Sequence, residues 1–200
     1  MNFDASVISS LEKYRLLVGG VTPRPIAWIS SQSKSGINNL APYSFFTVAS
    51  CNPPVLLYTQ VAQRSGVDKD TLQNIVETGQ CVVNIVNAEL LSKMNQTSAN
   101  LAADESEFDF ANIDTVCSQQ VKPLSVKDAP VRYECTLREI QEIGDNAVGG
   151  TMVLLDVQSI FVNEDLYDEG QINQKLINSV GKMGADFYSL TKHLKEIQRP

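Results

Sequence analysis

The chain has 200 residues, of which 43% are hydrophobic and 20% charged, and its formal net charge is −7. This length and balance suit a single globular domain with a sizeable core. The acidic balance argues against nucleic acid as a partner, because phosphate binding needs a basic face. No apolar stretch is long enough to span a bilayer and the N-terminus does not resemble a signal peptide, so we expect a cytoplasmic protein with no membrane partner.

The first predicted elements are a short apolar run and a hairpin. Residues 16–20 form an apolar run stopped by glycines, which fits either an edge strand or a loop. Residues 26–31 are rich in β-branched and aromatic side chains and predict a strand. Residues 33–36 have turn chemistry, and residues 37–41 predict the return strand of the hairpin.

Prolines lie at both ends of this hairpin. Pro23 and Pro25 bias Thr22 and Arg24 towards extended backbone, so the arginine is presented from a stiff ribbon. A proline in a central strand would remove a ladder hydrogen bond, which places Pro42 at a strand beginning, an edge or a bulge. The backbone around Pro42 is then free to face the edge of a planar ligand. The alternative is a hairpin with an irregular second strand and a partly buried aromatic cluster.

A strand, a helix and another strand follow. Residues 55–59 are apolar on both faces, as in a strand buried on both sides. Residues 69–79 predict the clearest helix, with Asp70 as N-cap and Gly79 as its stop. One face of this helix carries Leu72, Ile75 and Val76. Residues 81–86 predict the next strand.

The second half of the chain predicts more strand than helix. Leucine and methionine spacing in residues 87–101 suggests a helix. Residues 104–120 are acidic and either cover the barrel or form a solvated face, which their composition favours. In residues 131–138 the odd positions are apolar and face in, while the even positions are polar and face out. Residues 151–162 predict a long strand interrupted in hydrophobicity by Asp156.

Short strands in both halves, with few helices, favour an antiparallel barrel or sandwich decorated with helices. There is no internal repeat and no evident linker.

The four cysteines are far apart and His193 is the only histidine, so no metal site is expected. Cys81 and Cys135 lie in apolar runs and are interpreted as buried free thiols, although two disulfides are the alternative. His193 lies in a charged segment and is expected at the surface.

Several motifs occur together in the order typical of one family, and the chain resembles the flavin reductase-like, FMN-binding split-barrel family, to which flavoredoxin-type proteins belong. The resemblance covers residues 22–188. The motifs are Thr22-Pro23-Arg24-Pro25-Ile26-Ala27-Trp28, Asn39-Leu40-Ala41-Pro42-Tyr43-Ser44-Phe45-Phe46, Pro53-Pro54, Lys69-Asp70-Thr71-Leu72-Gln73-Asn74-Ile75 and Cys81-Val82-Val83-Asn84-Ile85-Val86.

This resemblance implies a mainly β fold with a few helices, a split antiparallel β-barrel. It further implies one domain over residues 1–200, with a core of about residues 20–188, and a homodimer that binds flavin at or near the subunit interface. Arg24, Lys69 and Thr71 are implied at the phosphate end of FMN. Residues 39–46 are implied as the wall that meets the isoalloxazine and ribityl groups, with Ser44 a polar contact. The full set of expected cofactor-binding residues is Thr22, Arg24, Pro25, Asn39, Leu40, Ala41, Pro42, Tyr43, Ser44, Phe45, Lys69, Thr71 and Asn74.

Elementary electrostatics agrees with this phosphate end. The net charge repels an anion at long range, so local cations and helix N-terminal amides must overcome the repulsion. Two positions depart from the family pattern. Lys182 replaces an arginine and keeps its charge without its bidentate geometry, and Asp156 stands in the late strand where relatives often have glutamate after glycine.

The resemblance implies an oxidoreductase in which NAD(P)H transfers a hydride to FMN, whose reduced form passes electrons to a further acceptor. No G-x-G-x-x-G follows a strand, so the nicotinamide would stack in the flavin cleft itself. An alternative is a non-catalytic FMN carrier that exchanges electrons with a redox protein without reacting productively with NAD(P)H. A third reading is a barrel that binds no flavin. Hydrolase chemistry is not expected, because no G-x-S-x-G elbow occurs.

Overall fold

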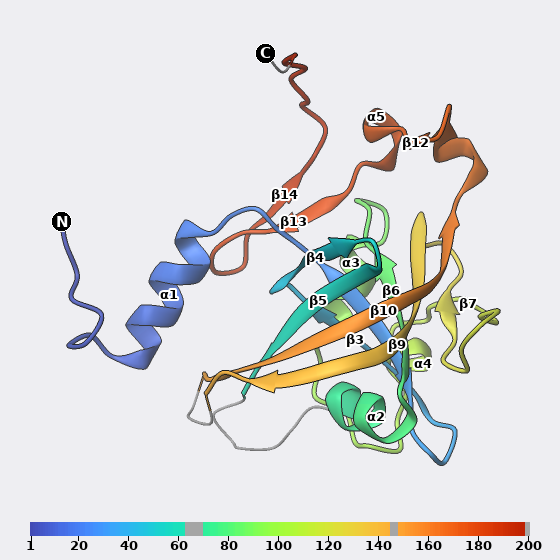
Figure 1. The fold of residues 1–200 in the computed structure, drawn as a ribbon, viewed down its shortest axis with the longest axis horizontal. Helices are drawn as coiled ribbons and strands as arrows, with labels where there is room; N and C mark the ends of the chain where they lie inside the picture. Colours follow the sequence, from blue (N-terminus) through green and yellow to red (C-terminus); the bar gives the residue numbers. More distant parts are fainter. Residues whose placement is uncertain (63–69, 145–147, 199–200) are drawn as a thin grey trace.

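The computed structural model describes residues 1–62, 70–144 and 148–198. Its main element is a seven-stranded sheet in the order β3-β2-β6-β9-β10-β5-β4, in which every pairing is antiparallel (Figure 1). The strands are β2 (Ala27–Gln32), β3 (Asn38–Tyr43), β4 (Phe46–Cys51), β5 (Pro54–Val61), β6 (Gln80–Ile85), β9 (Val131–Glu142) and β10 (Gly150–Val162).

The two edge strands of this sheet, β3 and β4, are consecutive in the chain. Only Ser44 and Phe45 separate them, so the sheet must curl until its edges approach each other. The backbone N–H of Thr59 in β5 donates to the carbonyl of Phe45 over 2.7 Å. The ring centroids of Tyr43 and Tyr58 lie 4.9 Å apart. The result is the predicted antiparallel barrel, split between β3 and β4.

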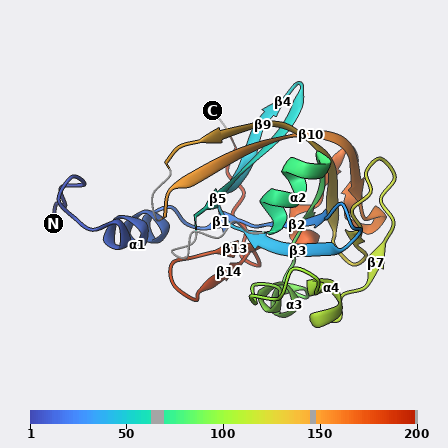
Figure 2. The ribbon, with the colours of Figure 1, turned by 90° about the horizontal axis from the view of Figure 1, so that it is seen from below.

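One face of the sheet encloses a core inside the barrel, and α2 (Asp70–Thr78) adds Leu72 and Ile75 to it. Figure 2 shows α2 between the layer of β2 and β3 and the layer of β9 and β10. Gly79 ends the helix with a φ of 71°, a left-handed conformation that glycine adopts without strain. The core residues are Ala27, Ile29, Tyr43, Leu56, Tyr58, Leu72, Ile75, Cys81, Val83, Cys135, Val153 and Leu155.

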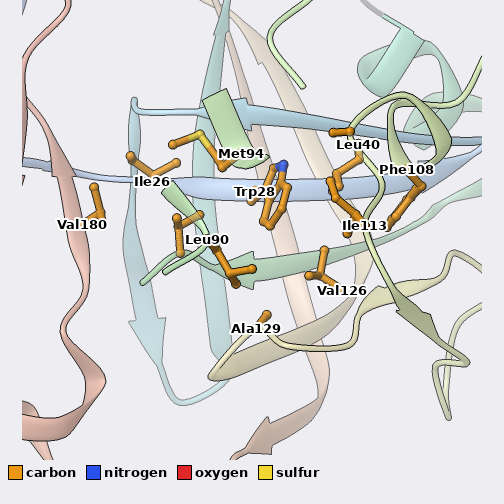
Figure 3. Packing of buried hydrophobic residues seen from close by; sticks show 12 residues of the cluster. Ile26, Trp28, Leu40, Leu90, Met94, Phe108, Ile113, Val126, Ala129 and Val180 are labelled. Carbon is orange, nitrogen blue, oxygen red and sulfur yellow. The ribbon is translucent and has the colours of Figure 1, made fainter. Parts of the chain in front are cut away.

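A second core lies on the outer face of β2, β3 and β6. Alternation along β2 sends Trp28 to this face while its neighbours point into the barrel. Figure 3 shows Trp28 at its centre, with Leu40, Phe108 and Ile113 on one side and Met94 on the other. The elements that add residues to this core are α3 (Leu91–Gln96), α4 (Glu107–Phe110) and β8 (Ser125–Val126), and β7 (Thr115–Val116) pairs with β8.

The remaining elements lie around the barrel. α1 (Ser10–Gly20) extends away from it at the N-terminal end (Figure 1). A three-stranded sheet has the order β1-β13-β14. Its strands and the other peripheral elements are β1 (Arg24–Pro25), β13 (Val180–Lys182), β14 (Tyr188–Leu190), β11 (Tyr167–Asp168), β12 (Gln171–Ile172), α5 (Gln174–Ile177) and the 3-10 helix η1 (Glu164–Leu166). No helix of the described residues is long and apolar enough to cross a membrane.

Most predicted strands are confirmed, and two helical predictions are refined. The hairpin is β2 and β3, and the strands predicted at 55–59, 81–86, 131–138 and 151–162 are β5, β6, β9 and β10. The helix predicted at 69–79 is α2. It begins at Asp70 itself, so this carboxylate occupies the first turn, where it complements the helix dipole, rather than the cap. Val76, expected on the apolar face, is 56% exposed.

The prediction of an edge strand or loop at residues 16–20 is wrong, because these residues are the end of α1. The helix starts with a capping box, in which the backbone N–H of Glu12 donates to Ser9 Oγ and that of Ser9 to a Glu12 carboxylate oxygen. The S-x-x-E signal is present in the sequence, where it begins seven residues before the apolar run of residues 16–20. In residues 87–101 only α3 is helical.

The solvated-face interpretation of residues 104–120 is also wrong at its centre. Phe108 and Ile113 are buried in the outer core, and Glu107 is only 7% exposed.

The inward and outward alternation predicted for residues 131–138 fails at Arg132 and Glu134, which are buried. The chain segment of residues 118–129 covers that face and hydrogen bonds to both side chains.

All four cysteines are free, with Cys81 and Cys135 buried as expected. Both side chains belong to the core inside the barrel. His193 is exposed, also as expected.

Candidate functional site

The outer edge of β3 is the first feature of the site. The N–H of Leu40 donates to Glu107 Oε2 over 2.9 Å, so it points away from β2. Backbone groups alternate along an antiparallel strand, and those of Pro42 therefore point to the same outer edge. In the described sheet no strand lies beyond β3. Pro42 sits at an edge, as its missing N–H requires.

A cleft of about 490 Å³ opens just after β3, where the chain passes from β3 to β4. That volume lies within the range of about 300–1,000 Å³ found for small-molecule sites. Its walls are mainly apolar, with Arg24, Ser44 and Thr47 as polar side chains. The lining residues are Leu17, Val18, Val21, Pro23, Arg24, Pro25, Ser44, Phe45, Phe46 and Thr47.

A smaller cleft of about 130 Å³ lies on the other side of Ser44, which lines both. It brings Pro42 together with Lys182 and Tyr188, from the C-terminal part of the chain. The remaining lining residues are Ile26, Met94 and Ser98. Tyr188 donates its hydroxyl proton to Asn95 Oδ1 over 2.9 Å. The sequence did not single out Met94, Ser98 or Tyr188 as site residues, because nothing local shows that α3 and β14 meet at β3.

Arg24 follows the cis Thr22–Pro23 peptide bond and is 7% exposed. Its Nη1 donates to the carbonyls of Val18, over 2.5 Å, and Val21, over 2.8 Å. Its Nη2 donates to the carbonyl of Met183 over 3.1 Å. The guanidinium thereby joins the end of α1 to the turn after β13.

Arg24 also approaches the residues that connect β3 to β4. Nε lies 3.4 Å from Ser44 Oγ, and the guanidinium carbon lies 5.9 Å from the centroid of the Phe45 ring. Burial lowers the pKa of Arg24. The charge is thus held at the wall of the larger cleft, with most of its donors bound to main-chain carbonyls.

Lys182 is paired in register with Arg24 across β1 and β13. Its Nζ donates to the carbonyls of Ala185 and Phe187 and lies 4.4 Å from the centroid of the Tyr188 ring. The pKa of Lys182 is lowered, chiefly by burial. Within the described ranges neither cation takes part in an ion pair. Two positive charges therefore stand side by side at the clefts of an acidic protein.

Three other predicted site residues meet in a buried polar cluster between β3 and α2. Asn39 Nδ2 donates to Thr71 Oγ1 over 2.7 Å, and Asn74 Nδ2 donates to Ser31 Oγ over 3.1 Å. Asn39 Nδ2 also lies 3.5 Å from Ser31 Oγ. These bonds fix the start of α2 against the hairpin.

The predicted site residues thus fall into separate places. Arg24, Pro25, Ser44 and Phe45 line the larger cleft, and Pro42 lines the smaller one. The members that lie elsewhere are Asn39, Thr71 and Asn74 in the polar cluster, Leu40 in the outer core, Tyr43 in the barrel interior, and the partly buried Thr22 and Ala41. Lys69 lies outside the described residues.

Glu107 is a part of the site that the sequence did not reveal. Burial raises the pKa of its carboxyl, the bond from Leu40 opposes this effect, and the charge of Asp70 adds to it. Its sequence context is acidic, and that composition was interpreted as a solvated face.

Asp156, one of the departures from the family pattern, lies away from the clefts and pairs with Arg138 across 2.6 Å.

The fold is thus an antiparallel barrel that is split between its edge strands, with a ligand-sized cleft at the split. The family model of the flavin reductase like domain matches residues 19–182. The chain therefore belongs to the flavin reductase-like family, and it is a flavin-related oxidoreductase.

Individual relatives agree with this assignment. An uncharacterized protein of Aquifex aeolicus is 34% identical over 88% of this chain and 88% of its own length. The fold is similar to that of nitrilotriacetate monooxygenase component B from Bacillus cereus, with a TM-score of 0.92, 29% identity, and coverage of 100% of this chain and 98% of that one. It is also similar to 2-nitrobenzoate 2-nitroreductase NbaA from Pseudomonas fluorescens, with a TM-score of 0.89, 29% identity, and coverage of 100% and 96%.

Proposed function

We propose that this protein binds FMN along the outer edge of β3 and reduces it with NAD(P)H. The observation that carries the proposal is a mainly apolar cleft of about 490 Å³ where the chain passes from β3 to β4, next to a strand edge that no further strand of the described sheet covers. A flavin ring needs both features, because its faces are apolar while one edge carries hydrogen-bonding atoms. The residues present fit such a group.

In this proposal the backbone from Pro42 to Ser44 meets the polar edge of the isoalloxazine ring, since the N–H of Leu40 is already bound to Glu107. The apolar walls of the cleft, including Phe45, exclude water from its faces. Ser44 offers a hydroxyl between the two clefts. When bound, FMN supplies the atom that accepts the hydride, its N5.

The phosphate end is proposed at Lys69, Thr71 and the first amides of α2, where N–H groups and the helix dipole favour an anion. Asn39 supports this end by holding the Thr71 hydroxyl. Arg24 contributes its charge and the shape of the cleft, since most of its donors already bind carbonyls.

A visible absorption spectrum tests the cofactor. The purified protein is measured before and after FMN is added and the excess is removed by gel filtration. We expect retained flavin bands at about one FMN per chain. A protein that neither retains FMN nor oxidises NAD(P)H when FMN is supplied would contradict the proposal.

Stopped-flow mixing of the FMN-loaded protein with NADH or NADPH tests the reaction. Bleaching of the flavin within seconds is expected, and it also reports which nucleotide is preferred. Absence of bleaching with both nucleotides would favour the electron carrier that exchanges electrons with a redox protein.

We also propose a homodimer, which sedimentation of the FMN-loaded protein checks by a mass of twice the 22.0 kDa chain.

A further inference from the structure

Glu107 occupies the position that another strand would take beside β3. Its Oε2 accepts the N–H of Leu40 over 2.9 Å, and the residue is 7% exposed. An edge strand needs partners for its outward backbone groups, and an unmet buried donor costs free energy. A side chain from α4, 67 positions further along the chain, meets that need here.

The next residue holds Glu107 in place. Phe108 is 4% exposed and packs in the outer core with Leu40 and Ile113, as Figure 3 shows. The backbone of α4 is therefore fixed against the outer face of β3, and the carboxylate reaches over the edge of the strand. Leu40 is held both through its side chain and through its amide.

This arrangement lies directly before the stretch proposed to meet the flavin. Leu40 is two residues from Pro42 and four from Ser44, which lines both clefts. A strand backbone bends little over two to four residues. The hydrogen bond at Leu40 therefore fixes the position and orientation of the backbone from Pro42 to Ser44. Burial of the Glu107 carboxylate near the charge of Asp70 costs free energy.

We propose that Glu107 is a positioning residue for the flavin, which acts by fixing the outer edge of β3. The inference rests on the proposed FMN site. It predicts that removal of the acceptor atom displaces residues 40–44 and changes both the affinity and the environment of bound FMN, although Glu107 itself touches no flavin atom.

Two variants at this position separate the acceptor from the charge. Glu107→Met keeps an unbranched side chain but removes the acceptor, and we expect it to weaken FMN binding about tenfold, equivalent to 1.4 kcal/mol, and to shift the visible circular dichroism of bound flavin. Glu107→Gln keeps an amide oxygen at the same reach. It should restore wild-type affinity within about twofold and restore the spectrum.

Glu134 provides a matched control. It is 8% exposed, and its carboxylate accepts the backbone N–H groups of Gln119 and Gln120, in a part of the molecule that lines neither cleft. Glu134→Met should lower thermal stability but leave FMN affinity and spectrum unchanged. If Glu107→Met also left both unchanged, Glu107 would be merely structural and the inference would be overturned.

Hydrogen exchange of the wild-type protein gives a second test that needs no variant. Added FMN should slow exchange in residues 38–46 and, through the Leu40 bond, in residues 107–113. Protection of the first segment without the second would overturn the positioning role. If wild-type protein bound no FMN, the proposed function itself would fail. If it bound FMN but Glu107→Met changed neither affinity nor spectrum, only this inference would fail, so the two failures are distinguishable.

Discussion

At the scale of single residues, Arg24 has a role that its motif did not show. The sequence placed it on a stiff ribbon as a phosphate ligand, and its assignment to that end of FMN stays a prediction. The structure adds three bonds from its guanidinium to main-chain carbonyls at the end of α1 and after β13. Such carbonyls are strongly held by a charged donor, and they lose their partner when it is removed.

Arg24→Met should therefore lower the free energy of unfolding by about 2 kcal/mol, in addition to any effect on FMN. Urea denaturation measures the change. Arg138→Met is the control, because the Arg138 side chain is 43% exposed in its ion pair with Asp156, and surface pairs contribute less than about 1 kcal/mol. Equal losses in the two variants would show that the carbonyl bonds of Arg24 contribute little.

Tyr58 presents the opposite case, a buried polar atom without a partner. Its side chain is fully buried, and its hydroxyl has no hydrogen-bond partner among the described residues. Tyr58→Phe should raise the free energy of unfolding by about 1 kcal/mol, because it removes an unsatisfied group and keeps the ring. The neighbouring Tyr43 bonds to Gln60 Oε1 and to Thr71, so Tyr43→Phe should instead lower stability. Thermal melts of both variants check the opposite signs.

At the scale of elements, the contact between β3 and α2 depends on polar side chains. Asn39 and Thr71 are both buried, and they meet at 2.7 Å. This pair holds the start of the helix against the strand whose outer edge forms the proposed site. The resemblance implied that both residues bind the flavin, which stays a prediction, and the structure shows that they also bind each other.

A double-mutant cycle of Asn39→Ala and Thr71→Val measures that contact. We expect a coupling of about 1 kcal/mol in the free energy of unfolding, the range for a buried side-chain hydrogen bond. The same four proteins are titrated with FMN, and each single variant should weaken binding because the helix start is no longer fixed. Strictly additive stabilities would show that the hairpin holds α2 by its apolar contacts alone.

At the scale of the whole molecule, the barrel interior contains groups that resist ionisation. Burial raises the pKa of Tyr58 and Tyr43. The pKa of Cys135 is also raised, first by its hydrogen bond with Cys81 and then by burial. The folded protein therefore keeps protons that the unfolded chain releases at high pH.

The melting temperature should consequently change little from pH 7 to about 8.5, the ordinary pKa of a thiol, and fall above it. The decline should steepen above about pH 10, where tyrosines of the unfolded chain ionise. Melts between pH 7 and 11 measure it. Cys135→Val should flatten the fall between pH 8.5 and 10, and an unchanged slope in that variant would assign the decline to other groups.

The sequence by itself determined six of the seven strands of the main sheet, because alternation, turn residues and prolines are local signals, but residues 46–51, which form β4, were not predicted as a strand. The pattern of strands left an antiparallel barrel and a sandwich open, and the resemblance to the family implied the split barrel. The missing N–H of Pro42 restricted it to a strand beginning, an edge or a bulge. Most of α1 was not predicted, although the capping box of Ser9 and Glu12 is present in the sequence. The two glycines near the end of the helix favoured a strand or a loop for residues 16–20.

Only the tertiary structure decided which residues meet. Glu107, Lys182 and Tyr188 reach the neighbourhood of β3 from distant segments, and no pattern in their own segments encodes that approach. Burial of Phe108 and Glu134 depends in the same way on what covers a face, and periodicity cannot report this. The reason is physical: local sequence sets backbone conformation and the direction of each side chain, whereas the environment that a side chain enters is made by elements far away in the chain.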